Sequence, residues 1–154
     1  MKAVIQRVSS ASVSVDGEIV GSCNKGYMIL LGVTEKDTEK DLETLAKKTV
    51  NLRVFTDSDD KMNLSLLDID GEVLVISQFT LCADVKKGNR PSFIAAMEPK
   101  RASEFYDRYC EMLKTLGVKK VEKGVFGADM QVSLVNDGPV TILFDTEIWC
   151  KNGN

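Results

Sequence analysis

The chain has 154 residues, 44% of them hydrophobic and 28% charged, with a formal net charge of −3 and no histidine. This length predicts one domain, residues 1–154, with enough chain to bury a sizeable core. A negative net charge argues against attraction of nucleic acid over the whole surface. The absence of histidine excludes Ser-His-Asp and Cys-His catalysis and any metal site that needs imidazole.

Neither a membrane span nor a secretion signal is expected. No apolar stretch approaches the length of a spanning helix, and the opening MKAVIQRV alternates as strands do. We therefore expect a cytoplasmic protein. The four cysteines lack a C-x-x-C pair, which predicts reduced thiols rather than metal ligands. They are Cys23, Cys82, Cys110 and Cys150.

The first half of the chain predicts four strands and one helix. Apolar and polar residues alternate at its start, and Asp16-Gly17 is typical of a hairpin turn. YMILLGV is a continuous apolar run that indicates a central strand. The predicted elements are strands at 2–8, 12–15, 18–23 and 27–33 and a helix at 38–52.

The second half predicts one long helix among strands. Pro99 begins a helix whose apolar stripe indicates core packing, and Gly117 ends it. Strands are predicted at 64–69, 73–81, 118–122, 130–135 and 140–145, with a polar loop at 57–63. This order predicts an α/β fold, strand-rich, with two main helices on one face of the sheets.

Two stretches are candidates for a functional site. SQFTL, at 77–81, places two hydroxyls and an amide at the end of a buried strand, although a solvent-facing strand gives the same pattern. NDGP, at 136–139, is typical of a hairpin turn, but a Gly-Pro bond is also among the few that adopt cis cheaply. A basic loop follows the first stretch and indicates either a phosphate contact or a solvated loop. Its cations are Lys86, Lys87 and Arg90.

Five segments together closely resemble the D-aminoacyl-tRNA deacylase family, in matching order and across nearly the whole chain. They are KAVIQRV, SQFTL, GNRPSF, GVFGADMQV and NDGPVT. The resemblance implies a hydrolase that cuts the ester between a D-amino acid and the 3′-terminal adenosine of tRNA. It implies a layered β/β/α fold of barrel-like sheets, and a homodimer with a site at each side of the subunit interface.

The resemblance also implies roles for individual residues. The family's Ser-Gln-x-Thr strand end corresponds to the expected catalytic residues Ser77, Gln78, Phe79 and Thr80. Its Gly-cis-Pro element corresponds to Gly138-Pro139, which is expected to enter the partner's pocket, braced by Arg7. The expected substrate-binding residues are Gly138, Pro139, Arg7, Asn136, Phe126 and Ala102, with Lys86, Lys87 and Arg90 as candidates for the tRNA phosphates.

Such a site needs no imidazole, because an aminoacyl ester is already activated. The 2′-hydroxyl of the substrate can orient water, while backbone N–H groups near Phe79 and Thr80 stabilise the developing oxyanion. Main-chain carbonyls at Gly138-Pro139 would collide with an L side chain, whereas glycine, as in glycyl-tRNA(Ala), would be accepted. Thr80 is expected to orient rather than attack, since the sequence supplies no base for it.

No metal or cofactor is expected, and two other functions stay open at this point. One is a non-catalytic module that binds the 3′ end of RNA through the same loop and aromatic pocket. The other is a structural homodimer in which NDGP is only a turn. A binder would protect the ester of D-tyrosyl-tRNA, whereas a deacylase would release the amino acid.

Overall fold

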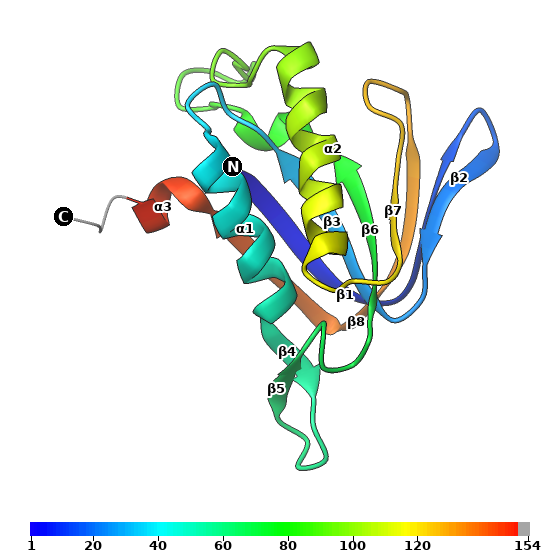
Figure 1. Cartoon of the computed structure of the whole chain (residues 1–154). Helices are drawn as coiled ribbons and strands as arrows, with labels where there is room; N and C mark the ends of the chain where they lie inside the picture. The colour runs from blue at the N-terminus through cyan, green and yellow to red at the C-terminus, as the bar shows by residue number, and fades with distance from the viewer. Residues whose placement is uncertain (151–154) are drawn as a thin grey trace.

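The chain forms a strand-rich α/β fold whose main sheet curls toward a nearly closed barrel (Figure 1). The structure, a computed structural model, describes residues 1–150. Within them the strands are β1 (Lys2–Val15), β2 (Glu18–Cys23), β3 (Gly26–Gly32), β4 (Arg53–Thr56), β5 (Met62–Ser65), β6 (Glu72–Ser77), β7 (Val121–Lys123) and β8 (Gln131–Asp145). The helices are α1 (Glu39–Asn51), α2 (Pro99–Thr115) and α3 (Thr146–Cys150), with a short 3₁₀ helix, η1 (Phe79–Cys82).

The main sheet has the order β2-β1-β3-β6-β7, with β8 paired to β1. β2 and β3 share one side of β1, and β8 follows the other side antiparallel to it. α1 and α2 cover one face of this sheet, as the sequence predicted (Figure 1). β4 and β5 form a separate hairpin around the predicted polar loop.

β8 is one strand where the sequence predicted two strands and a hairpin. Both halves pair with β1, from Lys2 opposite Asp145 to Ser14 opposite Gln131, with register shifts near Val8. The Oδ1 atom of Asn136 accepts the backbone N–H of Val140 at 3.1 Å, which holds the irregular middle of the strand. The predicted hairpin is wrong because each half finds its partner in β1 and not in the other half.

β6 carries the SQFTL stretch into the molecule. It pairs in parallel with β3 on one side and β7 on the other, so its apolar residues 73–76 are buried. The strand ends at Ser77, four residues before the predicted end, because Phe79–Cys82 coil into η1. Ser77 and the residues after it therefore lie at the edge of the sheet, where a strand gives way to a turn.

The two long helices follow their sequence signals closely. Thr38 begins α1 through a capping box with Asp41. The carboxylate of Glu98 begins α2 by accepting the N–H groups of Lys100 at 3.0 Å and Arg101 at 3.2 Å. The buried hydroxyls of Thr49 and Tyr109 lie 2.8 Å apart and join the helices across the core.

Three of the four thiols are buried and unpaired, as expected for reduced cysteines. Burial raises the pKa of Cys23 to about 11 and that of Cys110 to about 12, so both stay protonated. The side chain of Cys150 lies outside the described residues. Within residues 1–150, no helix is both long and apolar enough to cross a membrane.

Candidate active site

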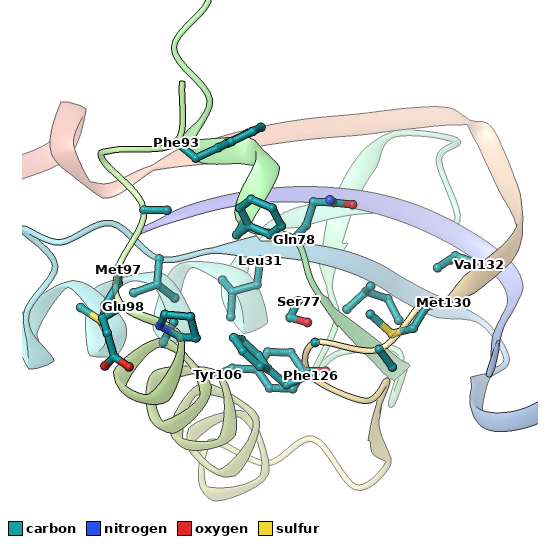
Figure 2. A pocket seen from close by; sticks show the side chains of 18 residues that line it. Leu31, Ser77, Gln78, Phe93, Met97, Glu98, Tyr106, Phe126, Met130 and Val132 are labelled. Atoms are coloured by element: carbon teal, nitrogen blue, oxygen red, sulfur yellow. The ribbon is translucent and has the colours of Figure 1, made fainter. Parts of the chain in front are cut away.

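A pocket of about 620 Å³ lies where β6 ends, between the start of α2 and the segment before β8 (Figure 2). Most of its wall is apolar, with Leu31, Met97 and Met130 among the side chains that line it. Ser77, Gln78, Glu98 and Tyr106 contribute the polar groups. An apolar cavity with few polar groups is the usual form of a binding site for a small molecule or a nucleobase.

The Ser-Gln-x-Thr stretch forms one edge of this pocket. Ser77, Gln78 and Phe79 line it, and the side-chain amide of Gln78 donates a hydrogen bond to the hydroxyl of Thr80. The oxygen of Thr80 is thereby used as an acceptor, and its own hydrogen can point to a ligand. Thr80 itself is exposed.

Two backbone N–H groups at the same edge are available to a ligand. Gln78 N–H donates to Leu31 and Leu81 N–H donates to Gln78, but those of Phe79 and Thr80 donate to no group within the described residues. The first N–H groups of a helical turn lack partners inside the turn. Adjacent unpaired donors of this kind can stabilise a negatively charged oxygen.

The opposite wall of the pocket holds an aromatic slot. The rings of Tyr106 and Phe126 lie with centroids 6.2 Å apart and with their planes tilted by 54° (Figure 2). Ala102 also lines the pocket. The Tyr106 hydroxyl donates to the carbonyl of Val75, and burial raises its pKa far above the usual value. Tyr106 is therefore a fixed, neutral part of the wall.

Glu98 is the carboxylate of the pocket, and its position favours a structural role. Hydrogen bonds from the N–H groups of Lys100 and Arg101 lower its pKa below the usual 4.5. A carboxylate that serves as a helix cap with a lowered pKa is a weak proton acceptor at neutral pH. The geometry therefore gives the pocket no strong general base among the described residues.

The basic loop connects to the rim of the pocket. Asp84 and Ser92 bridge its two ends, and Phe93, directly after it, packs edge-on against Phe79 with ring centroids 5.0 Å apart. Its cations all lie exposed on this loop. They are Lys86, Lys87 and Arg90.

A second group of predicted residues does not line this pocket. The Gly138-Pro139 bond is cis, and both residues are exposed on β8. The Nε atom of buried Arg7 donates to the carbonyl of Asp137 at 3.1 Å, and the Asn136 amide donates to Thr141 at 3.0 Å. Arg7 and Asn136 thus hold the segment that presents Gly138 and Pro139 to the exterior.

The structure therefore brings the predicted residues together in two clusters. Ser77, Gln78, Phe79, Ala102 and Phe126 line one pocket, while residues 136–139 and Arg7 form the other cluster within the same chain. Sequence reasoning missed Tyr106 and Phe93. Tyr106 belongs to an α2 stripe that was interpreted as core, and Phe93 stood in a motif without an assigned role.

Comparison with known proteins identifies the family of the chain. The profile of the D-Tyr-tRNA(Tyr) deacylase family matches residues 4–145. A solved structure described as "c-Myc DNA Unwinding Element Binding Protein" is similar with a TM-score of 0.89 and 45% identity, covering 94% of this chain and 98% of that chain. A second is described as a probable eukaryotic D-amino acid tRNA deacylase, with a TM-score of 0.80 and 18% identity, covering 93% of this chain and 97% of that chain. The chain therefore belongs to the D-Tyr-tRNA(Tyr) deacylase family, hydrolases that act on the ester bond of aminoacyl-tRNA.

Proposed function

We propose that the protein releases D-amino acids, and glycine mischarged on tRNA(Ala), from the 3′-terminal adenosine of tRNA, at sites shared between the subunits of a cytoplasmic homodimer. Residues 1–154 act as one domain, and no cofactor takes part. The observation that carries this proposal is the pair of free N–H groups at Phe79 and Thr80, set at the edge of a pocket with an aromatic slot.

The slot suits the terminal adenine. Phe126 offers a ring face on which the adenine can stack, and the small side chain of Ala102 leaves room for the base in the pocket. With the base there, the ribose and its ester would lie toward Ser77 and Gln78. The acyl carbonyl then lies within reach of the two free N–H groups.

Catalysis in this site consists of positioning and electrostatic stabilisation. The vicinal 2′-hydroxyl of the ribose orients a water molecule against the ester, and the N–H groups of Phe79 and Thr80 stabilise the oxyanion. The Gln78–Thr80 hydrogen bond supports an orienting role for Thr80, because it fixes the hydroxyl without removing its proton. A nucleophilic Thr80 would need a base, and no described residue beside it supplies one.

Selection against L-amino acids is assigned to the second cluster. Gly138 and Pro139 are exposed and do not line the pocket of their own chain, which supports their insertion into the pocket of a partner subunit. Their carbonyls would grip the substrate's amino group and leave no room for an L side chain. Glycine has no side chain that could collide with these carbonyls, so glycyl-tRNA is accepted as a substrate.

The basic loop completes the site. Lys86, Lys87 and Arg90 are exposed beside the rim and are assigned to phosphates near the acceptor end. A protein that grips only the 3′ end needs few such contacts, which agrees with its net charge of −3.

The deciding experiment compares D-tyrosyl-tRNA, L-tyrosyl-tRNA and D-tyrosyl-tRNA ending in 2′-deoxyadenosine. We expect fast release of D-tyrosine from the first and little release from the other two. Equal consumption of the D and L esters would contradict the steric selection. Fast cleavage of the deoxy substrate would contradict the role of the 2′-hydroxyl, and protection of the ester would indicate a binding module.

A further inference from the structure

A second cavity, of about 730 Å³, lies between the C-terminal half of α1, the start of β4 and α3. It shares no residue with the pocket described above. Figure 1 shows α1 and α3 on the side of the molecule away from β7, whereas Phe126 of the main pocket follows β7 in the chain. We name this cavity the basic hollow and define it by Lys47, Lys48, Arg53, Phe144 and Trp149.

The charge of the basic hollow is positive and uncompensated. Lys47 and Lys48 are exposed and form no ion pair with any residue in the described part of the chain. Arg53 donates to the carbonyl and the side-chain oxygen of Asn63, which are neutral acceptors. Three positive charges gather here on a chain whose net charge is negative, so the hollow favours an anion with more than one charge.

The floor of the hollow is aromatic. Trp149 packs edge-on against Phe144 with ring centroids 5.0 Å apart, and both belong to the main hydrophobic core or contact it. The Nζ atom of Lys48 lies 5.8 Å from the centre of the Trp149 ring. This cation–π contact holds the ammonium group in place without neutralising it, so it remains available to a ligand.

The hollow is joined to the Gly138-Pro139 segment by two hydrogen bonds. Arg53 directly precedes Val54, whose carbonyl accepts Nη1 of Arg7 at 2.6 Å. Arg7 in turn donates to Asp137 at 3.1 Å. Arg7 therefore links the strand that begins at Arg53 to the segment that presents Gly138 and Pro139.

We infer that the basic hollow binds the phosphate backbone of the tRNA whose 3′ end occupies the partner subunit's pocket. This inference rests on the proposed function, which places Gly138 and Pro139 in that pocket. The main pocket holds one nucleoside, and the strand leading to it carries a negative charge at every nucleotide. Lysine and arginine beside an aromatic floor are the groups that bind such a strand without reading its sequence.

The first test is the charge-reversal variant K47E/K48E, measured on D-tyrosyl-tRNA and on the minimal ester D-tyrosyl-adenosine. We expect KM for the tRNA to rise about tenfold. The plot of log affinity against log salt should become shallower, its slope decreasing in magnitude by about 2. The minimal ester, which has no phosphate strand, should be hydrolysed as by the wild type. Arginine at both positions, K47R/K48R, should restore the wild-type KM for tRNA.

The matched control is K25E/K61E, which makes the same change of charge at two exposed lysines outside the hollow. It should change KM for tRNA less than twofold. An equal effect of both variants, or an equal loss on tRNA and on the minimal ester, would overturn the inference while leaving the proposed function intact. A wild-type protein inactive on both D esters would instead refute the proposed function.

Mixed dimers test whether the contact is made across the interface. A102W is used to block one pocket, and K47E/K48E to disable one hollow. With the two changes in different subunits, the open pocket is served by the intact hollow, and tRNA affinity should match the wild type. With both changes in one subunit, affinity should fall about tenfold, and the opposite order would overturn the assignment.

Discussion

Arg7 and Asp137, 130 positions apart in the sequence, are joined by a 3.1 Å hydrogen bond from the guanidinium Nε to the backbone carbonyl. The same guanidinium donates from Nη1 to Val54 at 2.6 Å. A planar fork of donors is needed to reach both carbonyls at once. One buried side chain therefore fixes the exposed Gly138-Pro139 segment against the body of the subunit.

Replacing this arginine by lysine should damage activity more than stability. R7K keeps the charge but cannot satisfy both carbonyls, so we expect a loss of about 1–2 kcal/mol in the free energy of unfolding. Deacylation of D-tyrosyl-tRNA should fall more than tenfold. D137N is the control: it removes a half-exposed ion pair but keeps the carbonyl, and should cost less than about 1 kcal/mol in urea titrations.

Gly138→Ala tests how much free space surrounds the same segment. Gly138 has φ of +129°, and an added Cβ would lie 2.9 Å from Val140 Cγ2 and 3.1 Å from Arg7 Nη2. G17A, at φ of +81° with nothing within 4 Å, is the matched control for backbone strain alone. We expect G138A to lower kcat/KM more than tenfold and G17A to leave it unchanged, although each costs about 1–3 kcal/mol of stability. Equal kinetics for both variants would contradict this role.

Thr80→Val separates an orienting hydroxyl from a nucleophile. The backbone N–H groups remain in T80V, so part of the catalysis should survive. We expect kcat to fall by about 10- to 100-fold and T80S to restore it. Loss of all activity above background, or a covalent acyl-enzyme trapped at Thr80 in the wild type, would favour nucleophilic attack. Q78A should lower kcat to a similar extent and add little to T80V, because Gln78 acts through the Thr80 hydroxyl.

The pH dependence of the deacylation rate should reflect ionisation of the substrate and not of the side chains that line the pocket. Glu98 and Tyr106 are the ionisable side chains of the described pocket, with pKa values lowered and raised respectively. Neither changes protonation between about pH 5 and 9, so an inflection near 7.7–8.0 belongs to the substrate's amino group. E98Q should leave that inflection in place when rates are corrected for spontaneous hydrolysis. Its disappearance in E98Q would make Glu98 a catalytic base.

The lowered pKa of Glu98 also fixes the pH dependence of its contribution to stability. The cap stabilises α2 fully above 4.5, the usual pKa, and the contribution is lost as the pH falls through the lower folded-state value. The urea midpoint of the wild type should therefore exceed that of E98Q at pH 7. The difference should vanish near pH 2, and a difference that persists there would mean that charge is not its source.

Local signals predicted most of the fold, and long-range pairing explains the errors. Pro99 and the Asp16-Gly17 turn placed α2 and the β1–β2 hairpin correctly, because each acts on its own neighbours. The hairpin at residues 136–138 was wrong, because the strand after Gly138 pairs with β1, far away in sequence. The end of β6 was placed four residues late, since apolar Phe79 and Leu81 continue a strand pattern although the backbone turns into η1.

The candidate site was predicted mainly through its motifs. The resemblance grouped Ser77, Gln78 and Phe126, which the structure places around one pocket. It did not indicate Phe93, whose contact with Phe79 depends on how a loop folds back. The basic hollow has no motif at all: Lys48 and Trp149 lie 101 positions apart, and only the packing of α3 brings them together.

The long ladder between β1 and β8 also governs when the protein is able to fold. During synthesis β1 leaves the ribosome well before β8, which pairs with its second edge. The backbone N–H and C=O groups of that edge therefore stay unpaired until β8 emerges. Closure of the sheet waits for nearly the whole chain, which makes folding slow and exposes the nascent protein to edge-to-edge association. Inserting a slowly translated segment just before β8 should therefore lower the yield of soluble protein more than inserting the same segment after β8.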